Sequence, residues 1–364
     1  SNEKPPLQAL AKWGEHVTIQ NVKIVKDVVS VPVIGVGRMN DPALMLSALR
    51  TGAMDFVALG RESVCDPHLP EKIKEGRLDE ILTCTGCMQR CLYPNSFEEG
   101  FGISCMINPF SGKEHIWEIT PAEKKKKIAV VGAGPVGLQA AWILAKRGHE
   151  VKVYEKEITA GGQYRLAAVP AMKQELAKTI STYLTFCKKY GAEVIYGVKA
   201  TKEMLEQEGF DEIILACGAQ PLVPRIPGID GENVYLANQV LSFDMRLSGQ
   251  KILVLGAGLV GAEAAEVLST YGNKVTVVDM LDKAAPLAPI RPRENLLSRL
   301  DKAGVGFCLN SRVCEIRPDG IRYEQNGETK EMTGFDSIVL AFGSRSISDF
   351  DTGHFPSSGR RRGN

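Results

Sequence analysis

Apolar and polar positions alternate along the chain in patterns typical of strands and helices. Within residues 17–80, the apolar runs VPVIGVG and MDFVALG have the length and β-branched content of buried strands, and an amphipathic helical stretch precedes each of them. Two successive helix–strand steps are therefore predicted. Residues 81–120 lose this periodicity and gain cysteine, proline, glycine and asparagine. This composition predicts a loop region that a hydrophobic core does not order.

A strand–helix–strand pattern then occurs twice. The first copy starts at Lys127 with KIAVVGAG, PVGLQAAWILAKRG and HEVKVYEK, and the second starts at Lys251 with KILVLGAG, LVGAEAAEVLSTYG and NKVTVVDM. Alternating strands and helices predict an α/β fold with parallel sheets. The lysines at 124–127 are typical of a solvated linker. Residues 346–364, rich in serine, glycine and arginine without an apolar period, are expected to be a disordered or non-native tail.

Composition narrows the class of protein. The 364 residues suffice for two or three domains, and 44% hydrophobic with 24% charged residues is typical of globular proteins. No apolar run approaches the roughly 20 residues of a membrane span. The 44 basic and 43 acidic side chains nearly cancel, so no field attracts nucleic acid or an anionic membrane. We expect a small-molecule substrate and no nucleic-acid or membrane partner. Because no signal sequence is recognised, we expect a cytoplasmic location. Assembly into a homo-oligomer is left open.

The first repeated unit contains a glycine-rich turn. Gly132-x-Gly134-x-x-Gly137 follows a strand and opens a helix, and Glu155 ends the next strand. In this pattern the first glycine permits a tight turn, the second lets the backbone approach a pyrophosphate, and the third lets helix and strand pack closely. The acid binds a ribose hydroxyl. The motif in this context predicts dinucleotide binding.

The second unit repeats each of these features. Gly256-x-Gly258-x-x-Gly261 takes the place of the first turn, and Asp279 takes the place of the acid. A carboxylate there accepts a hydrogen bond from the ribose 2′-hydroxyl and repels a 2′-phosphate, whereas NADP sites usually have an arginine nearby. No arginine follows Asp279 directly, which favours NADH, although Lys283 leaves NADPH open.

Four of the nine cysteines are grouped. Cys84-x-x-Cys87-x-x-x-Cys91 is followed by Cys105, so three thiols lie on one short loop and a fourth comes later. Four thiolates suit either a [4Fe–4S] cluster or a structural zinc ion, and spacing alone leaves both open. A cluster beside dinucleotide-binding units would have a use in electron transfer that zinc lacks. The context therefore favours iron and sulfur at these four positions.

The two units together resemble flavoproteins with two dinucleotide-binding domains, in which the first domain holds FAD and the second NAD(P)H. Gly161, Gly162 and Gln163 in the segment TAGGQYR match a Gly-Gly segment near the flavin in those proteins, although a plain turn is the alternative interpretation. The Ala-Thr-Gly strand ends of such proteins occur here in altered form at residues 216–218 and 341–343.

The segments CTGCMQRCL and SCMINP resemble the region after the flavin barrel in the family of 2,4-dienoyl-CoA reductase, enoate reductase and trimethylamine dehydrogenase. The resemblance extends to about Arg345. In that family an FMN-binding barrel precedes a [4Fe–4S] segment and the FAD and nicotinamide domains. It implies a barrel remnant in residues 1–80, a cluster segment at 81–120, the first part of an FAD domain at 127–235 and an NAD(H) domain at 236–345.

The same resemblance makes residues 17–80 the last two βα units of a (β/α)₈ barrel, where phosphate groups commonly bind. Gly35, Gly37 and Arg38 come at the first strand end, and Gly60 and Arg61 at the second. Backbone amides and two guanidinium groups could therefore converge on an FMN phosphate. Without the resemblance, each Gly-Arg pair is typical of an ordinary turn.

The sequence also departs from this family. A full barrel needs roughly 250 residues, and only about 80 precede the cysteines, so six of eight strands are expected to be missing. The catalytic residues are expected in those strands and are unknown here. No glycine-aspartate segment returns to the FAD domain after the second altered Ala-Thr-Gly. We expect a fragment, or a disturbed reading frame after Arg345, without its own substrate site. The five histidines match no catalytic position; they are His16, His68, His115, His149 and His354.

The resemblance implies an NADH-dependent oxidoreductase. Electrons would pass from NADH through FAD and the cluster to FMN, and would reduce an activated C=C bond in an α,β-unsaturated acid or thioester. Amine oxidation occurs in the same family and stays open. A diaphorase-like subunit, similar to the small subunit of glutamate synthase, would instead deliver electrons to a partner protein; the barrel strands favour the reductase. A redox-inert remnant with empty flavin sites is the third alternative.

Overall fold

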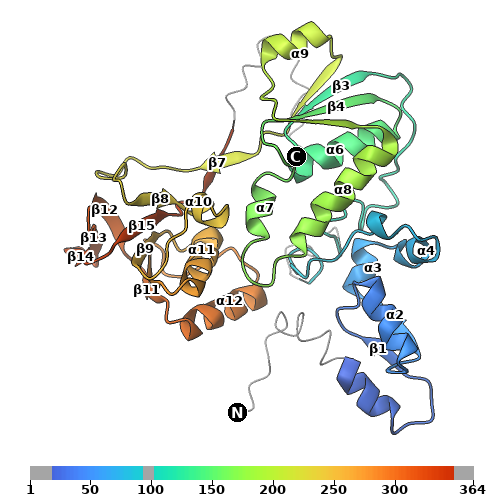
Figure 1. Ribbon diagram of the computed structural model, residues 1–364, viewed down its shortest axis with the longest axis horizontal. Coiled ribbons are helices and arrows are strands. Elements are labelled where there is room, and N and C mark those ends of the chain that lie inside the picture. Colours follow the sequence, from blue (N-terminus) through green and yellow to red (C-terminus); the bar gives the residue numbers. More distant parts are fainter. Residues whose placement is uncertain (1–18, 93–101, 348–364) are drawn as a thin grey trace. The chain divides into compact units, whose positions relative to one another are not determined.

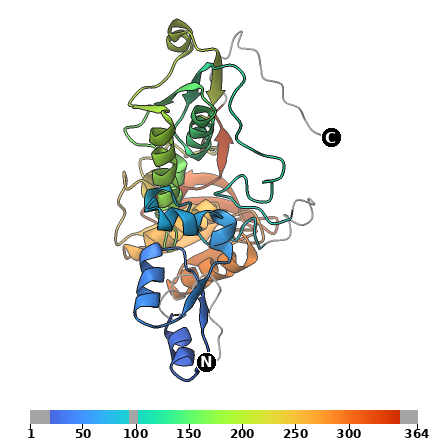
Figure 2. The same cartoon turned by 90° about the vertical axis from the view of Figure 1, so that its right-hand side faces the viewer.

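The computed structural model describes residues 19–92 and 102–347 (Figures 1 and 2). The chain divides into two compact units. Unit 1 comprises Ser1–Trp117, Leu166–Thr179 and Pro221–Ser344, and unit 2 comprises Glu118–Arg165, Ile180–Gln220 and Arg345–Asn364. In the described part of the chain, no helix has the length and apolar character needed to cross a bilayer.

The N-terminal part of unit 1 is a pair of parallel strands with helices beside it. β1 (Ile34–Val36) pairs with β2 (Phe56–Ala58), and α2 (Pro42–Arg50) connects them. Asp41 caps α2 by accepting the N–H of Ala43, because its side chain can reach the free amides of the first turn. Three short helices follow: α3 (Arg61–Cys65), α4 (Leu69–Lys74) and the 3₁₀ helix η1 (Leu78–Glu80).

One side of this strand pair is packed and the other is not. Met39, Met45 and Met54 form a small core with residues from α2 and α4. By contrast, Ile34 and Phe56 are 63% and 58% exposed. Exposed apolar side chains on neighbouring strands usually mark a contact surface.

Unit 2 contains a four-stranded parallel sheet in the order β5-β4-β3-β6. Its central strands are almost fully buried, as expected of parallel strands covered on both faces. The order reverses beside β3, and this switch point is where open α/β sheets bind ligands. The strands are β3 (Lys127–Val131), β4 (Glu150–Glu155), β5 (Glu193–Tyr196) and β6 (Glu212–Leu215). The helices are α6 (Pro135–Lys146), α7 (Gln163–Ala167), α8 (Leu176–Tyr190) and α9 (Lys202–Glu208).

The C-terminal part of unit 1 contains a second parallel sheet, in the order β11-β10-β9-β15-β8. Its strands are β8 (Val234–Leu236), β9 (Lys251–Leu255), β10 (Lys274–Val278), β11 (Gly306–Cys308) and β15 (Ser337–Leu340). Its helices are α10 (Ala237–Leu241), α11 (Leu259–Thr270) and α12 (Ile290–Lys302). An antiparallel sheet is inserted before β15, formed by β12 (Arg312–Arg317), β13 (Gly320–Gln325) and β14 (Glu328–Thr333).

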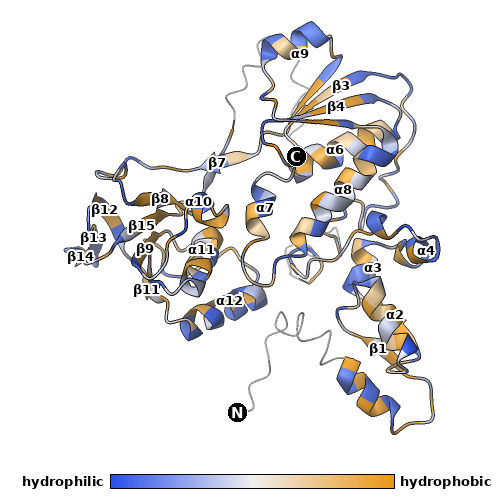
Figure 3. Ribbon diagram, in the orientation of Figure 1, coloured by the Kyte–Doolittle hydropathy of each residue, from blue (hydrophilic) through white to orange (hydrophobic). Residues whose placement is uncertain are grey.

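Strand β9 shows how this sheet is covered on both faces. Ile252 and Val254 pack with residues of α10, α11 and α12, whereas Leu253 and Leu255 pack with Ile316 and its neighbours in the antiparallel sheet. Successive side chains of a strand point to opposite faces, so an uninterrupted apolar run fills two cores. In Figure 3 the apolar colour follows β9 and β15, while α12 is largely hydrophilic.

The structure confirms the α/β class, with two parallel sheets of the dinucleotide-binding kind. A two-stranded sheet pairs β7 (Ala219–Pro221) with β16 (Ser344–Ser346), and the N–H of Ile347 donates to Gly218 O over 3.0 Å. Ser346 and Ile347 therefore have regular partners, although the sequence places them in the tail. Residues 348–364 lie outside the described part, as do His16 and His354.

Candidate functional site

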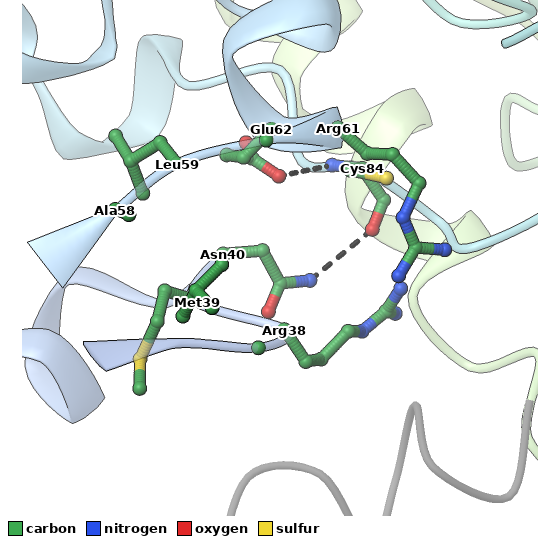
Figure 4. A pocket seen from close by; sticks show the side chains of 11 residues that line it. Arg38, Met39, Asn40, Ala58, Leu59, Arg61, Glu62 and Cys84 are labelled. Carbon is green, nitrogen blue, oxygen red and sulfur yellow. Dashed lines mark hydrogen bonds between the residues drawn. The ribbon is translucent and has the colours of Figure 1, made fainter. Parts of the chain in front are cut away.

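A cavity of about 110 Å³ opens at the carboxyl ends of β1 and β2. Its walls include Gly37, Arg38, Gly60 and Arg61, which are four of the five residues that the sequence assigns to a phosphate site (Figure 4). Arg38 has a φ of 51°, a conformation uncommon outside glycine, so the turn after β1 is tightly bent. Gly35 lies within β1 instead, where an added Cβ would be 2.4 Å from the sulfur of Met54.

The two arginines have donors without acceptors. The Arg38 side chain is 5% exposed, and its Nη2 is 3.1 Å from Glu175 Oε1. Within the described ranges, the buried Nε and Nη1 of Arg38 and the buried Nη1 of Arg61 have no hydrogen-bond partner. Both guanidinium groups extend to the same side of the cavity (Figure 4). Leaving buried charged donors unpaired is costly, so this arrangement fits an anionic group such as a phosphate.

Cys84 also lines this cavity and is fixed by both strand ends. Its carbonyl oxygen accepts the side-chain amide of Asn40 at 3.1 Å, and its N–H donates to Glu62 Oε2 at 2.9 Å (Figure 4). Burial raises the pKa of Glu62 to about 8, although the Cys84 N–H and Arg38 favour its charged form. The first cysteine of the motif is therefore held at the wall of the candidate phosphate pocket.

Two of the remaining cysteines of the motif, Cys91 and Cys105, have shifted pKa values. Burial raises the pKa of Cys91, and the Cys87 and Cys105 thiolates raise it further. Burial likewise raises the pKa of Cys84 to about 11. By contrast, the neighbouring Cys65 and then backbone N–H groups lower the pKa of Cys105 to about 6.

These thiols suit a metal–sulfur group in their chemistry. The N–H of Ile107 donates to the Cys105 sulfur at 3.4 Å, an interaction that stabilises a thiolate. In residues 19–92 and 102–347, however, no three histidine, cysteine, aspartate or glutamate side chains are close enough to share one metal ion. The residues at 93–101, between Cys91 and Cys105, lie outside the described part. Ligation by the four cysteines stays a prediction.

The first glycine-rich turn has the contacts that its motif predicts. Gly132 has a φ of 105°, and an added Cβ would be 2.4 Å from Ala216 O. A Cβ on Gly137 would be only 1.9 Å from Gly132 O, so helix and strand require glycine there. A Cβ on Gly134 would have no neighbour within 4 Å, which leaves room beside the turn. Glu155, 5% exposed, accepts the N–H of Ala133 at 2.8 Å.

The Gly-Gly segment lies next to this turn. The N–H of Gly161 donates to Ala133 O at 2.8 Å, and a Cβ on Gly162 would be 4.0 Å from Gly134 Cα. Both glycines have positive φ values. Gln163 begins α7, and its side chain donates to Ala219 O. Gly161 and Gly162 therefore lie beside residues 133 and 134 of the first turn.

The second turn reproduces these contacts. Gly256 has a φ of 113°, and its Cβ would be 2.4 Å from Ala341 O. A Cβ on Gly261 would be 1.9 Å from Gly256 O, and one on Gly258 would have no neighbour within 4 Å. Asp279 accepts the N–H groups of Ala257 and Leu281. Its carboxylate is therefore held at the tip of the turn.

Two residues of the first site were not identified from the sequence: Asn40 and Glu62. Asn40 and Glu62 follow the two Gly-Arg pairs closely, and a polar residue just after a strand end is the only signal that could have pointed to them. Their contacts with Cys84 span 44 and 22 residues, which no local pattern encodes.

The chain matches two known protein families and several characterised relatives. Residues 126–354 match the family described as pyridine nucleotide-disulphide oxidoreductase, and residues 7–80 match the NADH:flavin oxidoreductase / NADH oxidase family. An NADH oxidase of Thermoanaerobacter brockii is 36% identical over 93% of this chain and 52% of its own length. A cinnamate reductase of Clostridium sporogenes is 34% identical over 90% of this chain and 49% of its own length.

Among solved structures, a complex of 2-naphthoyl-CoA reductase with 2-naphthoyl-CoA superposes with a TM-score of 0.86 and 30% identity. The match covers 92% of this chain and 50% of that one. The chain therefore spans about half the length of the relatives that it matches. These matches confirm the resemblance and the oxidoreductase class inferred from the sequence.

Proposed function

We propose, from the premise that this chain belongs to the pyridine nucleotide-disulphide oxidoreductase family, that it transfers electrons from NADH towards an FMN-dependent reduction of an activated C=C bond. The class of flavin-dependent oxidoreductases that use a nicotinamide follows from the two matched families. The order of cofactors and the substrate are our proposal. When bound, the cofactors would supply hydride acceptance at FAD and one-electron steps through a [4Fe–4S] cluster to FMN.

The observation that carries the proposal is the position of Cys84. It lines the cavity whose walls include Arg38 and Arg61, two residues with unpaired buried donors, and it is also the first cysteine of the four-cysteine motif. A phosphate of FMN and a thiolate of the cluster would thus be held by one set of strand ends. A structural zinc ion transfers no electrons, so it would not explain a flavin pocket beside the cysteines.

Each group of residues has a proposed role. Gly37, Gly60 and the two arginines would bind the FMN phosphate, and the cysteines at 84, 87, 91 and 105 would each bind one iron. In unit 2, Gly134 would admit the pyrophosphate of FAD and Glu155 would bind its ribose. In unit 1, Gly258 and Asp279 would do the same for NADH.

The substrate class is proposed from the relatives. The cinnamate reductase is named for an α,β-unsaturated acid, and the superposed reductase was solved with an aryl thioester. We therefore propose an α,β-unsaturated acid or thioester as the substrate of the whole enzyme. The residues that protonate it would lie on barrel strands other than β1 and β2.

The proposal is tested by the cofactor content of the full chain after anaerobic purification. We expect the protein to contain FAD, and to contain iron and acid-labile sulfide in a one-to-one ratio. We also expect it to retain FMN when FMN is supplied. FAD and iron without any FMN binding would favour a diaphorase-like subunit. Protein that binds neither flavin, or that contains zinc and no sulfide, would contradict the proposal.

A further inference from the structure

We propose that Glu175 is a positioning residue of the flavin phosphate site: its carboxylate holds the Arg38 guanidinium at one nitrogen and leaves the other two nitrogens for the phosphate of FMN. The inference rests on the proposed function, because it requires that the cavity at the ends of β1 and β2 binds that phosphate. Glu175 itself would touch no ligand, since it reaches Arg38 from outside the described walls of the cavity.

The backbone around Glu175 is anchored in unit 1, the unit that also contains Arg38. Glu175 directly precedes α8, and its carbonyl oxygen accepts the N–H of Lys178 at 3.0 Å, so the first turn of the helix fixes its backbone. Two residues earlier, Lys173 forms an ion pair with Glu263, which is 6% exposed. The Glu175 carboxylate is therefore presented to Arg38 by a segment with its own anchor.

Two contacts confine the side chain of Arg38, which is 5% exposed. Its Nη2 lies 3.1 Å from Glu175 Oε1. An added Cβ on Gly86 would be 2.4 Å from Arg38 Nη1, so the guanidinium also lies against the backbone of the cysteine loop. A long, flexible side chain is thus ordered before a ligand arrives, and ligand binding need not order it.

Stability alone explains this ion pair poorly. A buried ion pair stabilises a fold only when its remaining polar atoms are hydrogen-bonded as well. Among the described residues, however, the buried Oε2 of Glu175 and the buried Nε and Nη1 of Arg38 have no hydrogen-bond partner. Orientation of the guanidinium gives the pair a role that its incomplete hydrogen bonding does not.

Orientation and charge predict opposite effects of Glu175 on phosphate binding. A carboxylate beside Arg38 repels an incoming phosphate, so a residue acting through its charge alone would weaken FMN binding. Removing that charge would then tighten the binding. If Glu175 orients Arg38 instead, a shorter side chain should weaken FMN binding even when the negative charge is kept.

The test measures the affinities of the full chain for FMN and for riboflavin by equilibrium dialysis. Glu175→Asp keeps the charge but withdraws the carboxylate by one methylene, Glu175→Gln keeps the length and an acceptor oxygen without the charge, and Glu175→Ala removes both. Glu331→Asp is the matched control, because Glu331 Oε1 is 2.9 Å from Arg317 Nη1 in another ion pair of unit 1. Circular dichroism checks that each variant is folded.

We expect the FMN affinity to fall roughly three- to tenfold in Glu175→Asp and Glu175→Ala, since binding must then order one long side chain. The riboflavin affinity should not change. Glu175→Gln should bind FMN at least as tightly as wild type, and Glu331→Asp should match wild type. In an Arg38→Ala background, Glu175→Asp should cause no further loss, because its effect passes through that arginine.

Three results would each overturn this inference alone: FMN affinity in Glu175→Asp that equals or exceeds that of wild type, an equal loss of affinity for FMN and riboflavin, or a loss in Glu175→Gln as large as in Glu175→Asp. If Glu175→Ala does not fold, the comparison of Glu175→Asp with Glu175→Gln still decides. Wild-type protein that binds FMN no more tightly than riboflavin would contradict the phosphate site of the proposed function, and this inference with it.

Discussion

The side-chain amide of Asn40 donates to the carbonyl oxygen of Cys84 across 3.1 Å, which ties the loop after β1 to the first cysteine of the motif. Glu62, just after β2, accepts the N–H of the same cysteine at 2.9 Å. Two neighbouring strand ends therefore hold both sides of one peptide segment. The position of Cys84 at the candidate phosphate pocket is therefore set by the two strand ends rather than by the cysteine loop.

Replacing Asn40 with alanine should loosen this segment. The partly buried Cys84 carbonyl would lose its donor, so we expect the free energy of unfolding to fall by about 1 kcal/mol. Iron should also be lost faster to a chelator. Ser63→Ala is the control, because that hydroxyl donates to Leu59 O on the exposed side of α3. Equal chelation rates and unfolding curves for Asn40→Ala and wild type would contradict the role given to Asn40.

Replacing Arg61 with alanine should weaken the binding of FMN but not that of riboflavin. A lost hydrogen bond to a charged group is worth about 1.5–3 kcal/mol, which corresponds to roughly a 10- to 100-fold weaker FMN affinity. Riboflavin lacks the phosphate and so tests the rest of the site. Arg50→Ala, at the exposed end of α2, is the control. An equal loss of affinity for FMN and for riboflavin would show that Arg61 does not bind the phosphate.

The two glycines of the first turn should respond differently to alanine. Gly137→Ala places a Cβ 1.9 Å from Gly132 O, so we expect unit 2 to be destabilised whether or not FAD is present. Gly134→Ala meets no atom within 4 Å, so the fold should persist while FAD is lost, because the methyl group would occupy the space of the pyrophosphate. Circular dichroism and released flavin separate the two effects. Retention of FAD in Gly134→Ala would contradict the assignment of this turn.

Asp279→Asn should reduce the preference for NADH over NADPH. The amide oxygen can still accept one backbone N–H, but the charge that repels a 2′-phosphate is gone. We expect the ratio of the two affinities to fall by about tenfold or more, as measured by equilibrium binding of both nicotinamides. Asp301→Asn, exposed on α12, is the control. Wild-type protein that binds NADPH more tightly than NADH would refute the prediction.

The sequence predicted the parts of the site that depend on local geometry. Gly132, Gly137 and Glu155 follow from the order strand, turn, helix and strand, since each position has one steric or polar requirement. The Gly-Arg pairs were identified in the same way, at the ends of strands. The sequence also predicted Gly35 as part of the phosphate site, but Gly35 lies within β1, next to Met54. The sequence does not give the exact end of the strand, and that end decides whether a glycine faces the core or lines the pocket.

The remaining features depend on tertiary contacts. Asn40 and Glu62 have no motif of their own, and each gains its role from Cys84, a partner many residues away. A periodic pattern reveals which face of an element is buried, but not which polar atoms meet there. The hydrogen bonds around the cysteine segment could therefore be recognised only once the strands had been placed.

The most direct test of the account is an anaerobic titration of the full chain with NADH, followed by optical absorbance and low-temperature EPR on the same sample. We predict that NADH bleaches the flavin absorbance and produces the EPR signal of a reduced iron–sulfur cluster, in proportion to the sulfide present. Flavin bleaching without any cluster signal, in protein that contains stoichiometric zinc and no sulfide, would contradict electron transfer through Cys84, Cys87, Cys91 and Cys105.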